Sequence, residues 1–149
     1  MKYFFWFMAF VFVVLTIAYR RGTLPENQEV RPESDFIYLS APPAKVGGLL
    51  QKYCYNCHSA QAQYPRLAHF APFHKKYIEP VTQGRKKLNF SKWDAYTPEL
   101  QKVLLLVAVE QMENNAMPVS GVFFVDDTLA PMDKQLLMQW LAQEAEAGM

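Results

Sequence analysis

Apolar residues recur at helical spacing in several segments of the chain, and this pattern predicts an all-α fold. The clearest short segment is residues 44–53, which leads directly into the first cysteine and is expected to contact the last helix or a ligand. Its adjacent glycines, Gly47 and Gly48, weaken the helix and are expected to let another helix approach closely. The apolar residues that share one side of this helix are Val46, Leu49, Leu50 and Tyr53.

Two longer helices are predicted in the second half of the chain. The first begins at Pro98, with Thr97 as N-cap and Glu99 in the first turn. Its apolar composition predicts that it is the most buried helix of the fold. The second begins at Pro131 and ends at Gly148. The apolar residues that recur along this last helix are Met132, Leu136, Trp140 and Leu141.

Residues 59–92 are predicted to form loops. They contain Pro65, Pro72 and Pro80, and basic side chains dominate from Lys75 to Lys92. Prolines and aromatic rings in the first part are consistent with a loop that covers the core, or with an apolar wall for a flat ligand. Most of the basic side chains that follow are expected to lie in solvent. The alternative is that Arg85 or a neighbouring lysine binds an acidic group of a ligand or steers an acidic partner.

Residues 3–19 are uncharged and strongly apolar, between Lys2 and the pair Arg20–Arg21. As a helix they would extend about 26 Å, the short limit for a hydrocarbon core about 30 Å thick. Snorkelling of the flanking basic side chains can cover the difference. We therefore expect a transmembrane anchor over residues 1–21, in contact with the lipid bilayer. A cleaved signal peptide is the alternative, although this run is longer and more aromatic than a usual signal core.

The composition of the rest of the chain predicts a tether followed by one domain. Residues 22–43 combine four prolines with charges of both signs, which predicts a tether, and residues 44–149 are long enough for a single domain. The formal net charge of +1 argues against nucleic acid as a partner, because nucleic-acid-binding domains are usually strongly basic.

The chain's two cysteines, Cys54 and Cys57, are three positions apart and are followed directly by His58. This spacing is typical of covalent haem attachment: each sulfur bonds one vinyl group and the imidazole binds the iron. A redox dithiol would need a βαβ setting that this sequence lacks. A zinc site needs about four ligands, and only His69 and His74 remain as further histidines.

Haem iron of this kind usually takes a second axial ligand, and a methionine thioether serves this role in many cytochromes. Met117 is the strongest candidate, because it follows the helix after Thr97 and precedes Pro118, which stiffens the loop. Met112 and Met138 lie within predicted helices, where a core role is expected. The alternative distal ligands are His69 and His74.

Several stretches together resemble the family of small bacterial c-type cytochromes called the haem-binding domain family. They are Cys54–Ser59, Tyr64–Pro65, Ala71–Pro72, Gly84–Arg85, Leu88–Trp93, Met117–Pro118 and Gln139–Leu141. The likeness spans roughly residues 45–142, and Leu-Asn-Phe-Ser-x-Trp is its most specific part. The resemblance implies a cytochrome c-like helical domain, one covalent haem c, an N-terminal membrane segment and haem attachment outside the cytoplasm.

These observations predict a membrane-anchored monohaem cytochrome that transfers single electrons. Cys54, Cys57, His58 and Met117 would hold the haem, and His58 and Met117 would bind its iron. Because both axial positions are then filled, an electron carrier is favoured over an enzyme. The alternatives are a haem peroxidase, a gas or redox sensor with a labile Met117, or a haem-free zinc module. We expect a single-pass protein of the bacterial inner membrane, facing the periplasm, with redox proteins or a membrane oxidoreductase complex as partners.

Overall fold

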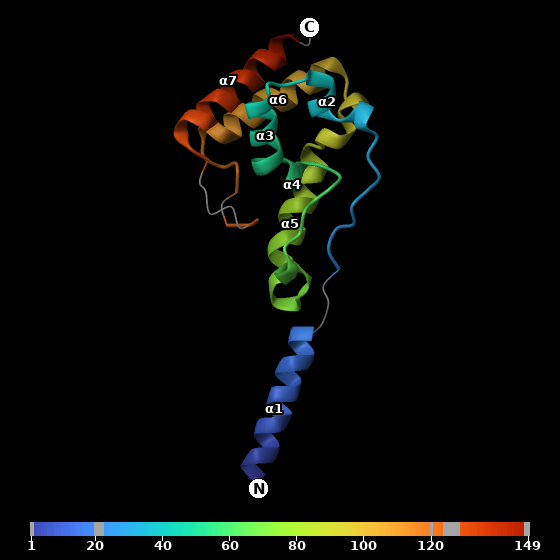
Figure 1. The fold of residues 1–149 in the computed structure, drawn as a ribbon, viewed down its shortest axis with the longest axis vertical. Coiled ribbons are helices and arrows are strands. Elements are labelled where there is room, and N and C mark those ends of the chain that lie inside the picture. The colour runs from blue at the N-terminus through green and yellow to red at the C-terminus, as the bar shows by residue number, and fades with distance from the viewer. Residues whose placement is uncertain (1, 20–22, 120, 124–128, 148–149) are drawn as a thin grey trace.

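The computed structural model describes residues 2–19, 23–119, 121–123 and 129–147, and it confirms the predicted all-α fold (Figure 1). Short 3-10 turns connect the helices at Pro32–Ser34, Arg66–His69 and Phe90–Ala95. The helices are α1 Lys2–Tyr19, α2 Phe36–Ser40, α3 Ala44–Tyr53, α4 Tyr55–His58, α5 Ala71–Lys87, α6 Pro98–Glu113 and α7 Pro131–Ala147.

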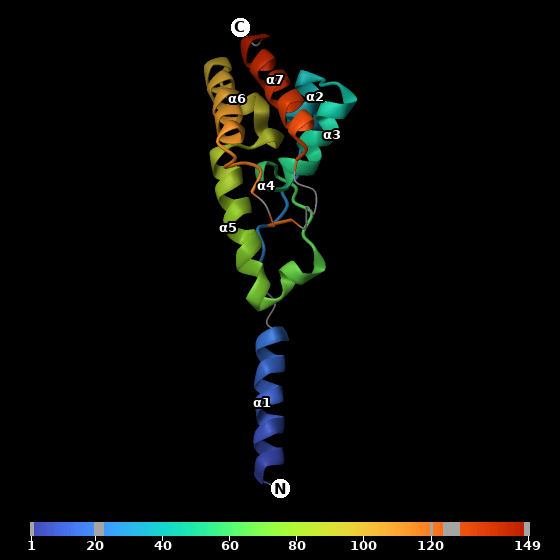
Figure 2. The same ribbon diagram turned by 90° about the vertical axis from the view of Figure 1, so that its left-hand side faces the viewer.

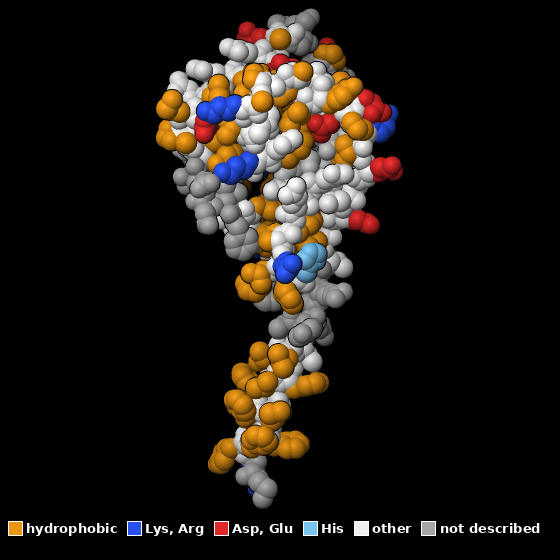
Figure 3. Space-filling model, viewed as in Figure 1, with side chains coloured by type: hydrophobic (Ala, Val, Ile, Leu, Met, Phe, Trp, Pro, Cys, Tyr) orange, Lys and Arg blue, Asp and Glu red, His pale blue; other side chains and the backbone are white. Residues whose placement is uncertain are grey.

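Helix α1 extends away from the other helices, and the face in view is covered by apolar side chains (Figures 2 and 3). Within the described part of the chain, no helix is both long and apolar enough to cross a membrane. The transmembrane helix predicted over residues 3–19 is therefore wrong. The 18 residues of α1 extend about 27 Å, which is less than a hydrocarbon core about 30 Å thick. Arg20, which together with Lys2 was expected to make up the difference, lies outside the described residues.

The main core is formed by α3, α6 and α7 together with α2 and the 3-10 turn Phe90–Ala95. Phe36 of α2 lies at its centre, fully buried, with its ring 5.0 Å from Phe90 and 4.6 Å from Trp93, between centroids. Leu50 of α3 and Leu137 of α7 are also fully buried. Segments before and after the cysteine motif thus share one core, which fixes the position of the motif between them.

The structure confirms the predicted start of α6 but not the predicted burial of this helix. Thr97 caps α6 by accepting a hydrogen bond from the Leu100 backbone N–H, as expected. However, α6 is not the most buried helix, because one of its faces lies in solvent and only Leu105 and Met112 are buried. In α7 the apolar spacing that includes Met132 does not correspond to burial at that position, since the Met132 side chain is 82% exposed. The Gly148 end of α7 lies outside the described residues.

Helix α5 replaces much of the loop predicted for residues 59–92. It has 17 residues and contains Pro80 in its interior, although proline costs a helix about 3 kcal/mol. The buried positions Tyr77, Val81, Gly84 and Leu88 recur at helical spacing along this segment and its C-cap. This periodicity was the signal for a helix, and packing of this face against α4 and the neighbouring segments offsets the cost of the proline.

Candidate functional site

The cysteine motif forms one tight helical turn, α4, directly after α3. Backbone N–H groups of Cys57 and His58 both donate to the Cys54 carbonyl, at 3.1 and 2.9 Å. Because residues three and four positions apart share a helix face, this turn places both sulfurs and the imidazole on one side. Both cysteines are free thiols, so the structure provides the three groups that the sequence predicts at the site.

His58 is oriented by two backbone carbonyls from the end of α5. Its Nδ1 lies 3.1 Å from the Gly84 oxygen and 3.1 Å from the Leu88 oxygen. Carbonyls only accept hydrogen bonds, so Nδ1 carries the proton and Nε2 remains free as a metal ligand. Burial lowers the pKa of His58, and these two hydrogen bonds only partly oppose that effect. The imidazole is therefore neutral at pH 7, as ligation to iron requires.

The close approach of α5 to α4 depends on Gly84. A Cβ at this position would lie 2.4 Å from the Cys57 carbonyl oxygen and 3.0 Å from the carbonyl carbon. Gly47 and Gly48, by contrast, meet nothing closer than the Pro42 ring, 3.7 Å from a Cβ on Gly47. The expected close helix contact is thus formed by a different glycine, 26 residues after the histidine that its carbonyl holds.

The thiols lie in a protein environment that keeps them protonated. Burial is the main cause that raises the pKa of Cys54 to about 12 and that of Cys57 to about 11. Redox dithiols normally have depressed pKa values, because the thiolate is the reactive form. The environment therefore argues against a thioredoxin-like dithiol. In the described ranges, no three His, Cys, Asp or Glu side chains gather to hold a metal ion, so nothing there supports the zinc alternative.

Met117 lies on the segment that follows α6, as predicted, and its position is fixed at the backbone. Its N–H donates to the Gln111 carbonyl in the last turn of α6, at 3.1 Å. The half-buried side chain packs against the main core, as does Cys54. Met112 is 4% exposed within the same core, and Met138 also packs there, which confirms their expected structural roles. Met149 lies outside the described residues.

The two other histidines lie away from His58. His74 is in the first part of α5, ten residues before Gly84, which corresponds to about 15 Å along the helix axis. His69 precedes this helix, in the turn Arg66–His69. Because the His58 imidazole is held at the other end of α5, this arrangement argues against either histidine as the second ligand of the same iron.

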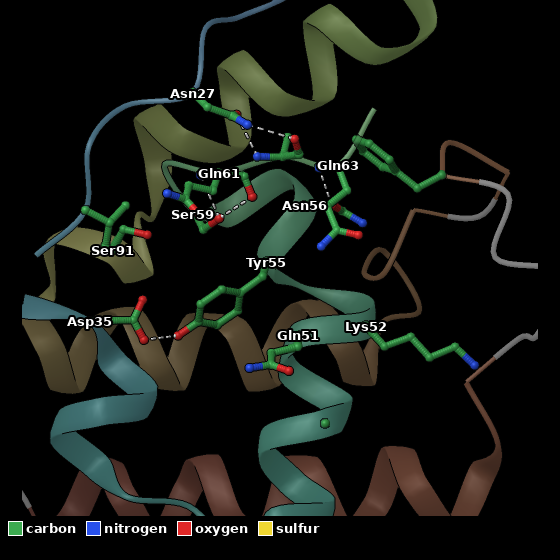
Figure 4. A pocket seen from close by; sticks show the side chains of 14 residues that line it. Asn27, Asp35, Gln51, Lys52, Tyr55, Asn56, Ser59, Gln61, Gln63 and Ser91 are labelled. Carbon is green, nitrogen blue, oxygen red and sulfur yellow. Dashed lines mark hydrogen bonds between the residues drawn. The ribbon is translucent and has the colours of Figure 1, made fainter. Parts of the chain in front are cut away.

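Tyr55, inside the motif, ties the turn to the N-terminal segment. Its hydroxyl donates to the Asp35 carboxylate at 2.8 Å (Figure 4). It also accepts from the Ile37 backbone N–H at 3.2 Å. Its ring stacks on Phe90, with 5.3 Å between centroids. Burial and the Asp35 carboxylate raise the pKa of Tyr55, so the phenol stays neutral and keeps donating. Sequence reasoning missed this residue, because its partner lies 20 positions earlier.

We expect the Tyr55→Phe variant to lose about 1–3 kcal/mol of unfolding free energy, because both hydrogen bonds of the hydroxyl are removed while the stacked ring remains. Urea unfolding of the variant and the wild type measures the difference. Tyr38→Phe is the matched control, since the Tyr38 side chain is 64% exposed. Equal destabilisation by both substitutions would contradict the proposed role of the Tyr55 hydroxyl.

A cavity of about 970 Å³ lies beside the motif, on the side lined by Tyr55, Asn56 and Ser59 (Figure 4). Neither cysteine nor His58 lines it, and its walls are mainly carboxamide and hydroxyl side chains. The three groups predicted to hold the haem therefore do not line this cavity. The main core, which Cys54 and Met117 both contact, is the apolar environment in contact with the motif.

The donor set fits a haem group. Two free thiols and a neutral imidazole with a free Nε2 share one face of α4. This combination in a small helical domain defines the class of haem-binding proteins. The chain belongs to the haem-binding domain family, which it matches over residues 11–143. No curated protein and no solved structure matches the chain significantly.

Proposed function

We propose that this protein is a monohaem c-type cytochrome that transfers single electrons. The observation that carries the proposal is the single turn on which Cys54, Cys57 and His58 share a face, with Nδ1 of the histidine held by two carbonyls. Cys54 and Cys57 would each hold the group by addition of the thiol across one vinyl group, with sulfur on one carbon and the thiol hydrogen on the other. His58 Nε2 would bind the iron, and bound haem would supply the one-electron couple.

Met117 is proposed as the distal ligand, and this assignment favours electron transfer over catalysis. A thioether on the segment fixed to α6 is a soft donor suited to haem iron. With both axial positions filled, no open coordination site remains for a substrate. A peroxidase or gas sensor would need a distal acid or base, and the distance of His69 and His74 from His58 supplies no support for one.

We further propose that the domain works outside the cytoplasm of a bacterium, at the periplasmic face of the inner membrane. The support is the c-type sequence pattern, because the resemblance to c-type cytochromes implies that the haem is attached outside the cytoplasm. Redox proteins, among them a membrane oxidoreductase complex, are the proposed donors and acceptors. Exposed basic side chains at the end of α5, Lys86 and Lys87, would steer an acidic partner at low salt.

We expect the full chain, produced in cells that mature c-type cytochromes, to carry one haem that survives denaturation. A pyridine haemochrome spectrum and intact-protein mass spectrometry measure this directly. The double variant Cys54→Ala, Cys57→Ala is the control and should carry no covalent haem. Unmodified thiols in the wild type, with no tetrapyrrole adduct, would contradict the proposal. Zinc recovered in stoichiometric amount would favour the structural module instead.

A further inference from the structure

Arg85, in the last turn of α5, binds the residue that follows the iron-binding histidine. Its Nε donates to the Ser59 carbonyl at 2.7 Å. Its Nη1 donates to the Glu26 carbonyl at 2.8 Å, and its Nη2 to the Asn27 side-chain oxygen at 3.1 Å. One guanidinium thus joins α5, the cysteine motif and the N-terminal segment.

The N-terminal segment is bound to the loop after the motif by further hydrogen bonds. The Asn27 side chain accepts from the Ala62 N–H at 2.8 Å and donates to the Ala62 carbonyl at 3.1 Å. The Gln28 N–H donates to the Ala60 carbonyl at 3.0 Å. Asn27 is therefore fixed by two contacts of its own, and it holds the guanidinium in place against the motif.

Gly84 and Arg85 are adjacent in α5, and they bind two adjacent residues, His58 and Ser59. The Gly84 carbonyl fixes the His58 imidazole, and the Arg85 side chain fixes the backbone of Ser59, which is 1% exposed. A shift of α5 relative to this backbone would move the Gly84 and Leu88 carbonyls away from Nδ1. The arginine therefore supports the orientation of the ligand without touching the iron.

The same side chain places a permanent charge beside the site, because arginine stays protonated in proteins. The charge lies close to the proposed ligand, because Arg85 Nε is 2.7 Å from the carbonyl oxygen of Ser59, the residue after His58. The three acceptors of the guanidinium are two carbonyls and an amide oxygen, all neutral. No carboxylate in the described ranges forms an ion pair with Arg85.

We propose that Arg85 is a positioning residue for His58 whose uncompensated positive charge also raises the reduction potential of the haem. This inference rests on the proposed function. Oxidation adds one positive charge at the iron, and a fixed positive charge nearby disfavours that state. The motif is half-buried, which limits screening, so part of the effect should persist at moderate salt.

The test is the midpoint potential of the haem-loaded full chain, measured by spectroelectrochemical titration. Arg85→Gln should lower it, with up to a tenfold rise in the ferric-to-ferrous ratio at fixed applied potential, or about 59 mV for one electron. Arg85→Lys keeps the charge and should retain most of the wild-type potential. Lys86→Gln is the matched control, because it removes one charge from the adjacent, exposed position and should change little.

A second variant keeps the arginine and cancels its charge. Asn27→Asp keeps the two hydrogen bonds that Oδ1 accepts, loses the one that Nδ2 donates to the Ala62 carbonyl, and places a carboxylate against the guanidinium. Like Arg85→Gln, it should lower the reduction potential, and it tests the inference even if Arg85→Gln does not fold. Potentials equal to that of Lys86→Gln in both variants would overturn the inference. Failure of the wild type to bind haem would instead contradict the proposed function.

Discussion

Replacing Gly84 with alanine is expected to destabilise the folded chain by about 3 kcal/mol or more, because the added methyl group has no room. The obstructing atoms are the carbonyl oxygen and carbon of Cys57, 2.4 and 3.0 Å away, and backbone atoms cannot rotate aside as a side chain can. Helix α5 must then move off α4, which separates the Gly84 carbonyl from His58 Nδ1. Urea unfolding and the haem content of the purified variant measure the two consequences.

Gly48→Ala is the control for this substitution. A Cβ on Gly48 meets nothing within 4 Å, and alanine favours a helix over glycine by about 0.5–1 kcal/mol. This variant should therefore be slightly more stable than the wild type and should bind haem normally. If Gly84→Ala folds as well as Gly48→Ala and retains its haem, then the close packing of α5 on the motif is not required.

The parts of the site that the sequence could predict are those set by local spacing. Two cysteines and a histidine at i, i+3 and i+4 share a face in any helical turn, so Cys54, Cys57 and His58 could be placed together without knowing the fold. The Thr97 cap and the α3 face around Leu50 are local features as well, and the structure confirms both. The distal position of Met117 stays a prediction.

The supporting contacts could not be predicted, because they join residues far apart in the chain. Gly84 and Arg85 reach His58 and Ser59 from 26 positions away, and Asn27 reaches Arg85 across 58. Such pairs depend on how α5 packs, and the prolines of this segment led to the prediction of a loop instead of a helix. Burial of α6 was overestimated for the same reason: apolar composition does not show which face a neighbour covers.

Removing the Met117 thioether is expected to open the iron to exogenous ligands. In the wild type, a firmly six-coordinate iron should resist carbon monoxide in the reduced state. In Met117→Ala the haem should bind carbon monoxide stoichiometrically, and the reduction potential should fall, because methionine ligation favours ferrous iron. Optical titration with carbon monoxide measures the first effect, and spectroelectrochemistry measures the second.

Two further variants separate loss of a ligand from loss of a methionine. Met132→Ala removes a thioether from a side chain that is 82% exposed, and it should behave as the wild type does. Met117→His replaces the thioether with an imidazole, so carbon monoxide binding should again be suppressed while the potential falls below that of the wild type. Carbon monoxide that binds the wild type as readily as Met117→Ala would remove Met117 as a firm ligand. That outcome would shift the balance from an electron carrier towards a gas sensor.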